Sequence, residues 1–355
     1  MILKKEKLNE LLCALQKTAQ VFVPQNIDGQ VNFAPFTPYN SKSSSGEGST
    51  ANLALDAQNS IFPPKDLLFP QAEKMYRYGQ TTQGNMFINP ILNSEEQIIF
   101  GIRPCDMRSI ECLDDVFFTK GYVDEYYEVK REKLCCICIA CTSYAQTCFC
   151  ESMGNDPQAA PAADIMLHEK ESYWNVEPQT DKGKELFENV WVNFCEETSN
   201  AAADTTSTTS TNAQITVDAK NVEAKISALE NSDELWDALS IKCLNCGTCT
   251  FLCPTCYCFD IEQENRNKEG VRFRCWDSCM FSEYTQMAGG HNPRPTKRDK
   301  VKNRFMHKLA WFEQRYDKKL CVGCGRCIEK CPVGLDITVL IDKVNEMSKG
   351  DNSYA

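Results

Sequence analysis

The apolar positions in the first half of the chain predict an α/β unit. A continuous apolar run, typical of a strand buried on both faces, consists of Ile98, Ile99, Phe100 and Ile102. Arg103-Pro104 interrupts this run, and Asp106 then has the position of a helix N-cap. The apolar residues that follow at helical spacing are Met107, Ile110, Leu113 and Phe117. A second apolar run at 134–140 predicts a neighbouring strand, so strand, helix and strand follow one another.

Helical periodicity is found at both ends of the chain. Residues 1–23 predict an amphipathic helix, whose apolar face consists of Leu8, Leu11, Leu12 and Leu15. Residues 297–316 predict another, whose apolar stripe consists of Val301, Phe305, Leu309, Phe312 and Tyr316. Because little of the C-terminal half alternates with a period of two, that half is predicted to be mainly α-helical.

Two stretches of low complexity divide the chain. Residues 40–60 are rich in Ser, Gly and Asn and predict a flexible loop. Residues 197–214 contain too few apolar side chains to order themselves, so they predict a domain boundary. The expected organisation is an α/β (or α+β) domain at 1–195, a linker at 196–233 and a helical domain at 234–345.

Cysteine is the residue type that changes this picture most. The 355-residue chain has 22 cysteines, which implies either disulfides in an oxidising compartment or metal-bound thiolates in a reducing one. The N-terminal segment has charges inside its apolar pattern and no small-residue cleavage site, unlike a signal peptide. Since no run of 18 apolar residues exists, no membrane insertion is expected. We therefore expect a cytoplasmic protein whose cysteines bind metal.

The charge of the chain is unevenly distributed. A net charge of −11 argues against nucleic acid as the main partner. The stretch 291–319, however, has ten Lys and Arg against three Asp and Glu. We expect this stretch to form a solvated helix face rather than a nucleic-acid site, or a docking face for an acidic partner.

Two cysteine runs have the spacing of bacterial ferredoxins. CLNCGTCTFLCP (243–254) and CVGCGRCIEKCP (321–332) both follow C-x2-C-x2-C-x3-C-P. In two-cluster ferredoxins the fourth cysteine of each run ligates the other cluster. Two [4Fe–4S] clusters are therefore predicted, one held by Cys243, Cys246, Cys249 and Cys331, the other by Cys321, Cys324, Cys327 and Cys253. Structural zinc is the alternative, but zinc sites use separated pairs of ligands.

Glycines accompany both ferredoxin-type runs. Gly247, Gly323 and Gly325 are expected to let the backbone approach the cluster sulfides closely.

Four cysteines of the N-terminal half form a candidate third cluster site. Cys105 follows the first predicted strand, Cys141 follows the second, and Cys148 and Cys150 lie in the next loop. If the strands are parallel neighbours, these thiols meet at the carboxyl edge of the sheet, where function tends to lie. Four thiolates are what a cubane cluster requires. The alternative is a set of buried structural thiols.

The segment CPTCYC (253–258) leaves two cysteines unassigned. Cys256 and Cys258 are either packed thiols beside the clusters, part of a further metal site, or a reactive thiol pair. The metal site would include Cys279, together with Cys275 or His291.

Several motifs together resemble one family. They are RPCD (103–106), TCFCESMG (147–154), CPTCYCFD (253–260), WDSCM (276–280), AGGHNPRPTK (288–297), RFMHKL (304–309) and CVGCGRCIEKCP. In these motifs the chain is similar to the 4Fe–4S dicluster subunit of anaerobic sulfite reductase and to the beta subunit of cytoplasmic sulfhydrogenases. The resemblance covers most of residues 61–155 and 234–340, and Cys256, Cys258 and Cys279 recur in its pattern.

The resemblance implies a role in electron transfer. Members of this family pass electrons between a flavin- and NAD(P)H-binding partner and a separate catalytic subunit, so a hetero-oligomer is implied. The chain has no G-x-G-x-x-G after a strand and no G-x4-G-K-[ST], so no flavin or nicotinamide is expected on it.

The sequence is also compatible with two other functions. One is a redox enzyme in its own right, with a catalytic cluster in the N-terminal domain. The other is a cluster-containing nucleic-acid-binding protein that uses residues 291–319.

Overall fold

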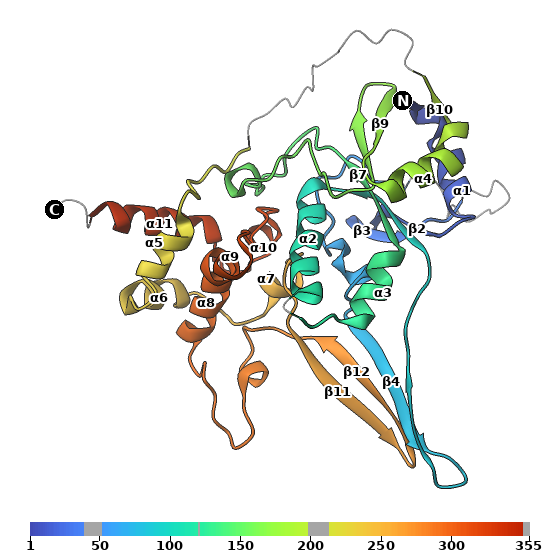
Figure 1. Cartoon of the computed structure of the whole chain (residues 1–355). Coiled ribbons are helices and arrows are strands. Elements are labelled where there is room, and N and C mark those ends of the chain that lie inside the picture. The colour runs from blue at the N-terminus through green and yellow to red at the C-terminus, as the bar shows by residue number, and fades with distance from the viewer. Residues whose placement is uncertain (39–51, 120, 198–212, 351–355) are drawn as a thin grey trace.

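The computed structural model of the chain describes residues 1–38, 52–119, 121–197 and 213–350 (Figure 1). Most of the two low-complexity stretches, residues 39–51 and 198–212, lies outside the described residues. The N-terminal half forms an eight-stranded sheet of order β10-β1-β9-β8-β7-β6-β2-β3. Its strands are β1 (Ile2–Lys4), β2 (Gln20–Ile27), β3 (Gln30–Pro35), β6 (Gln97–Ile102), β7 (Leu134–Ile139), β8 (Ile165–Glu169), β9 (Tyr173–Pro178) and β10 (Cys195–Glu196).

The centre of this sheet is parallel and its two sides are antiparallel. Strands β2, β6, β7 and β8 pair in parallel, and the flanking pairs are antiparallel. The helices of this half are α1 (Leu8–Leu15), α2 (Pro104–Phe118), α3 (Glu125–Lys133) and α4 (Asp181–Asn189). A mixed α/β fold, as predicted, is therefore present.

The predicted strand–helix–strand unit corresponds to β6, α2 and β7. Alternate residues of β6 face two different cores: Ile98 and Phe100 lie in one, Ile99 and Ile102 in the other. This two-sided burial explains why the strand is a continuous apolar run. Because β6 and β7 are parallel neighbours, the residues that follow them meet at one edge of the sheet.

Two expectations for the N-terminal half were wrong in detail. Asp106 is not an N-cap, because α2 already begins at Pro104 and Arg103 occupies the cap position. A proline fits the first helical position, where its missing N–H costs nothing. The helix expected over 1–23 is limited to α1, because the segments before and after it pair as strands β1 and β2.

The C-terminal half contains helices and one β-hairpin. Its helices are α5 (Val222–Ala228), α6 (Asp233–Ser240), α7 (Thr248–Phe251), α8 (Lys297–Met306), α9 (Phe312–Tyr316), α10 (Arg326–Glu329) and α11 (Ile337–Gly350). A π-helical segment, His307–Trp311, joins α8 to α9. The residues of the predicted 297–316 stripe that are fully buried are Val301, Phe305, Leu309 and Phe312. Among the described residues, no helix is long and apolar enough to cross a bilayer.

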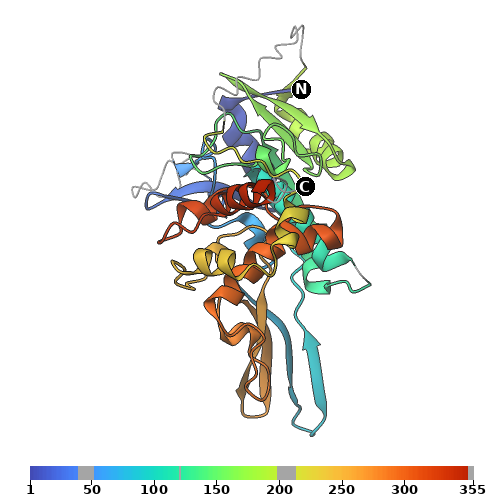
Figure 2. The ribbon, with the colours of Figure 1, turned by 90° about the vertical axis from the view of Figure 1, so that its left-hand side faces the viewer.

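A second sheet is made of strands from both halves of the chain. Its order is β11-β12-β4-β5, with β4 (Ala72–Gln80), β5 (Met86–Pro90), β11 (Phe259–Arg266) and β12 (Glu269–Trp276). It projects from one end of the molecule in both views (Figures 1 and 2). The hairpin β11–β12 lies between the two ferredoxin-type runs, so the expectation of a mainly helical C-terminal domain missed it. Nearly all of β11 is solvent-exposed and polar, which removes the alternation that would have revealed it.

A buried ion pair fastens the second ferredoxin-type run to the α/β half. Arg326 of α10 donates to both carboxylate oxygens of Asp106 on α2, at 2.6 and 2.7 Å. Its Nε also donates to the Ser60 carbonyl at 2.7 Å. The two charged side chains are 2% and 1% exposed, so each depends on the other for compensation.

Replacing Asp106 with Asn should lower the free energy of unfolding by about 3–5 kcal/mol, because a buried guanidinium loses its counter-charge. The matched control is Glu111→Gln, which removes the partner of Arg108 in a pair that is 32% exposed on each side. That control should cost less than about 1 kcal/mol. Urea denaturation of anaerobically prepared protein measures both values. Equal, small losses would show that the junction does not depend on the buried pair.

Candidate functional site

Two cavities bring the ferredoxin-type cysteines together. The first cavity is lined by Cys243, Cys246, Cys249 and Cys331. The second cavity is lined by Cys321, Cys324, Cys327 and Cys253. Each cavity therefore takes three cysteines from one run and the fourth cysteine from the other run. Cys246 is the exposed member of the first cavity, whereas Cys324 in the second is buried.

The two runs have the same local structure. Gly247 and Gly325 both have positive φ, +74° and +78°, and each precedes a short helix, α7 or α10. A residue with a Cβ is strained in this left-handed region, so glycine is favoured at both turns. The repeated spacing in the sequence thus corresponds to a repeated backbone conformation.

The glycines of the second run serve contacts within the protein. A Cβ on Gly323 would lie 2.6 Å from the Cys150 Cα, and one on Gly325 would lie 2.3 Å from the Thr147 carbonyl oxygen. The Phe149 N–H donates to the Gly323 carbonyl at 2.9 Å. Gly323 and Gly325 were expected to let the backbone approach the cluster sulfides. They also allow the 147–150 loop to pack against this run.

Two buried cations from the α8–π-helix segment face the cysteines. Arg304 lines both cavities, whereas Lys308 lines only the second. Burial works to lower the pKa of Arg304, but the thiolates of Cys249 and Cys327 outweigh it and raise that pKa. Burial likewise opposes the charge of Lys308, and Cys253 and Cys256 raise its pKa. Lys308 donates to Thr255 Oγ1 at 2.5 Å.

Neither cation was singled out by the sequence. The sequence contained one indication that both cations are buried. Arg304 and Lys308 are four residues apart and lie on the side of the helix that carries the apolar stripe. The expectation of a solvated helix face at 291–319 was therefore wrong for part of the stretch. Lys300, Arg304 and Lys308 are buried.

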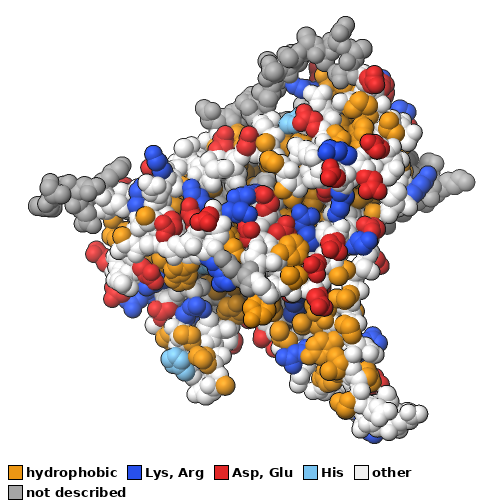
Figure 3. Space-filling view, viewed as in Figure 1, with side chains coloured by type: hydrophobic (Ala, Val, Ile, Leu, Met, Phe, Trp, Pro, Cys, Tyr) orange, Lys and Arg blue, Asp and Glu red, His pale blue; other side chains and the backbone are white. Residues whose placement is uncertain are grey.

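Other cations of this stretch are paired within the chain. Arg298 lies 3.1 Å from Asp233, and Lys318 lies 2.8 Å from Asp115. On the face shown in Figure 3, acidic and basic side chains are interspersed and no broad basic area is seen. These contacts leave little of the stretch as an open basic strip for nucleic acid or an acidic partner.

The chemistry of the two cavities fits [4Fe–4S] clusters. The Arg304 Nε is buried and has no hydrogen-bond partner among the described residues, although a buried charged donor normally has one. Four thiolates at each cavity would supply both the ligands and the negative charge that Arg304 and Lys308 face. Within the described part of the chain, no three Cys, His, Asp or Glu side chains converge as a single metal ion requires.

The N-terminal cysteines also come together. Cys105 and Cys150 pack with Cys324 and Val322 in one buried cluster. Cys148 adjoins them, because its sulfur lies 3.8 Å from the Cys324 carbonyl oxygen. Burial, followed by the Cys148 and Cys141 thiolates, raises the pKa of Cys150 to about 12.

Cys256, Cys258 and Cys279 do not form one group of three. Cys256 forms a hydrogen bond with Cys253. Cys258 forms one hydrogen bond with Cys279 and another with Tyr284. The Cys279 contact lowers the pKa of Cys258 to about 6.

The environment of this segment is otherwise structural. Lys65 donates to the Cys256 carbonyl at 2.7 Å and lies 4.1 Å from the Trp276 ring centre. Burial lowers the pKa of Lys65 to about 8. Cys275 pairs with Asp260 across β11–β12, and His291 lies on an exposed loop, so neither is brought to these thiols.

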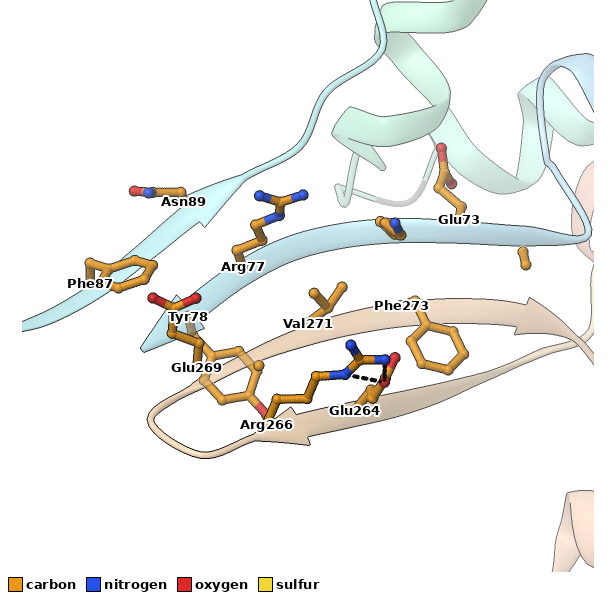
Figure 4. A pocket seen from close by; sticks show the side chains of 13 residues that line it. Glu73, Arg77, Tyr78, Phe87, Asn89, Glu264, Arg266, Glu269, Val271 and Phe273 are labelled. Atoms are coloured by element: carbon orange, nitrogen blue, oxygen red, sulfur yellow. Dashed lines mark hydrogen bonds and ion pairs between the residues drawn. The ribbon is translucent and has the colours of Figure 1, made fainter. Parts of the chain in front are cut away.

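Another hollow lies on the projecting sheet. Figure 4 shows its walls on β4, β5, β11 and β12, with Arg77, Tyr78, Phe87 and Val271 among the lining side chains. Its lining contains no cysteine. An exposed pair, Arg266 with Glu264 at 2.8 Å, crosses one wall and contributes little to stability. The hollow therefore has no part in the thiol chemistry.

Comparison with known proteins agrees with the cysteine geometry. A family model described as a 4Fe-4S dicluster domain matches residues 242–335. The chain is 32% identical to sulfhydrogenase 2 subunit beta of Pyrococcus furiosus over 300 residues, which is 83% of this chain and 86% of that protein. No solved structure matches the chain significantly. The protein is thus an iron–sulfur protein with a 4Fe–4S dicluster domain in its C-terminal half.

Gly323→Ala should destabilise the protein more than Gly334→Ala. Both glycines have positive φ, +66° and +63°, so both variants carry a conformational cost of about 1–2 kcal/mol. Only Gly323 has backbone atoms of Cys150 in the way, whereas Gly334 has no atom within 4 Å. The overpacking adds about 1–3 kcal/mol. Denaturation midpoints measure the difference, and equal midpoints would contradict the packing of the 147–150 loop against the second run.

Proposed function

The chain belongs to the family of sulfhydrogenase beta subunits, and from this we propose that it is the electron-carrying subunit of a redox complex. In this proposal it passes electrons between a flavin- and NAD(P)H-binding partner and a separate catalytic subunit. The observation that carries the proposal is the pair of cavities, each lined by three cysteines of one ferredoxin-type run and the fourth of the other.

The proposed ligands follow from the lining of the cavities. Cys243, Cys246, Cys249 and Cys331 would hold one cluster. Cys321, Cys324, Cys327 and Cys253 would hold the other. A [4Fe–4S] cluster, when bound, accepts and releases electrons one at a time at a potential set by charge, hydrogen bonds and exposure. Cys256, which forms a hydrogen bond with Cys253, and the hydrogen-bonded pair Cys258 and Cys279 are proposed to be packed thiols.

The protein's own residues set the environment of these sites. Arg304 places one positive charge against both cavities, and Lys308 adds a second charge at the second cavity. Phe149 and Ile337, both about 1% exposed, close the second cavity against water. Low water access and fixed positive charge strengthen electrostatic control of a bound cluster.

The first cavity is the proposed contact point for a redox partner. Cys246 is exposed there, and its neighbours Ile241 and Leu244 are 75% and 63% exposed. Exposed aliphatic side chains beside an exposed ligand suit a partner surface that must approach closely. No site for a flavin or nicotinamide is proposed on this chain, and a cytoplasmic location is proposed because its thiols would be metal ligands.

The experiment that tests this function compares the chain alone with the chain plus a candidate flavoprotein partner. Under anaerobic conditions, dithionite should bleach the visible absorption of the isolated chain, whereas NADH and NADPH should not. Adding the candidate flavoprotein partner should restore bleaching by NAD(P)H. Turnover of a substrate by the isolated chain would instead favour an enzyme in its own right.

Cys253→Ser should affect the same cluster as Cys321→Ser, because both cysteines line the second cavity. Each variant should lose about four of about eight ferredoxin-type irons and the same reduced-state EPR signal. Cys331→Ser should match Cys243→Ser in the same way. A Cys253→Ser spectrum that matches Cys243→Ser would contradict the crossed assignment.

Arg304→Gln should lower the reduction potentials of both clusters, because each reduced state loses a nearby positive charge. The expected size is on the order of 59 mV, a tenfold change in a one-electron equilibrium. Lys308→Gln should lower only the potential of the second cluster, since Lys308 lines only that cavity. Arg304→Lys keeps the charge and serves as control. EPR-monitored titration separates the two signals, and unchanged potentials in Arg304→Gln would refute this role.

A further inference from the structure

Four cysteines outside the dicluster domain converge at one edge of the eight-stranded sheet. Cys105 lies in the first turn of α2, directly after β6, and Cys141 lies just after β7. The parallel pairing of β6 with β7 places these two positions at the same carboxyl edge. Cys148 and Cys150 come from the loop that follows Cys141. Three of the four, Cys105, Cys148 and Cys150, are 7–8% exposed.

Three of the four thiols lie around Cys324. Cys105 and Cys150 pack with it, and the Cys148 sulfur lies 3.8 Å from its carbonyl oxygen. Tyr144, from the same loop as Cys148 and Cys150, packs on this cluster.

Buried positive charge lies next to these thiols. Burial raises the pKa of Cys141, Cys105 and Cys148, and two buried cations oppose this rise: Arg103, which is 6% exposed, at Cys141, and Arg326 at Cys105 and Cys148. Arg103 is held in place by the carbonyls of Ala57 and Ala140, at 2.7 and 3.2 Å. Such cations reduce the cost of forming the thiolates that metal ligation requires.

A buried amide completes the surroundings. The Asn59 Nδ2 donates to the Cys324 carbonyl at 2.8 Å and lies 3.8 Å from the Cys148 sulfur. The Asn59 Oδ1 is buried and has no partner within the described residues. The thiols therefore lie beside polar and charged side chains, unlike cysteines packed in a purely apolar core.

We propose that Cys105, Cys141, Cys148 and Cys150 bind a third [4Fe–4S] cluster. Four cysteines are the ligand set of such a cluster. The inference rests on the proposed electron-transfer function, which it extends from the C-terminal half into the α/β half.

The third site lies directly beside the second cavity. Cys105 and Cys150 pack against Cys324, which lines that cavity. Phe149, between Cys148 and Cys150 in the sequence, lines the second cavity itself. The second cavity thus adjoins the third site, and it shares Arg304 with the first cavity, where Cys246 is exposed.

The test is a count of iron and acid-labile sulfide per chain on anaerobically purified protein, with EPR of the reduced state. The parent protein should contain about twelve irons, four per cluster. Cys141→Ala and Cys150→Ala should each lose about a third of the iron and sulfide and one EPR signal. Cys138→Ala is the matched control: it is buried in β7, three residues before Cys141, and packs in the apolar core. It should retain all the iron.

The outcomes separate this inference from the proposed function. About eight irons in the parent protein, unchanged in Cys141→Ala, would overturn the third cluster and leave the proposed function intact. Retention of all twelve irons in both variants would also overturn it, by placing the extra iron elsewhere. Iron near four or below in the parent protein would overturn the proposed function itself. Unfolding midpoints of Cys141→Ala and Cys138→Ala show whether a loss of iron reflects lost ligation or lost folding.

Discussion

The buried pair between Asp106 and Arg326 is the constraint on which the arrangement of sites depends. Arg326 stands between two cysteines of the second ferredoxin-type run, and Asp106 follows Cys105 in the chain. A bidentate, desolvated pair fixes both distance and orientation, because neither charge can be left without the other. The pair therefore sets where the thiols of the sheet edge stand relative to the second cavity. The close contact of Gly323 with Cys150 adds a steric requirement at the same junction.

The cavities place negatively charged ligands beside buried cations, so that each charge reduces the energetic cost of burying the other. Arg304 and Lys308 would be costly to bury in a purely apolar helix bundle. Against thiolate-ligated clusters the same charges are compensated, so the stability of the C-terminal half and the filling of its sites depend on each other. The free energy of unfolding would then be highest when the clusters are bound, which is the state in which the chain functions.

Much of the local chemistry could be predicted from the sequence, because cysteine spacing within a run determines the loop conformation around a cluster. The α/β unit was also predictable, since β6 and β7 are buried on both faces and are therefore continuously apolar. The hairpin β11–β12 was not, because β11 is stabilised by pairing and shows no apolar alternation. Arg304 and Lys308 were missed for a related reason: charged helical residues usually face water, and only the fold shows that these face inward.

Because Cys246 is exposed, its thiol is vulnerable to oxidation when the chain carries no metal. None of the other ferredoxin-type ligand thiols is exposed, and burial raises the pKa of Cys249, Cys321, Cys324 and Cys327, so these thiols resist oxidation. Cys246 is exposed, and a hydrogen bond from the Thr248 hydroxyl, at 3.3 Å, lowers its pKa. Thiolate character and access together make it the first of these thiols to form a sulfenic acid in air. Oxidative damage would thus begin at the first cavity, at the surface proposed for partner contact, and a bound partner would protect it.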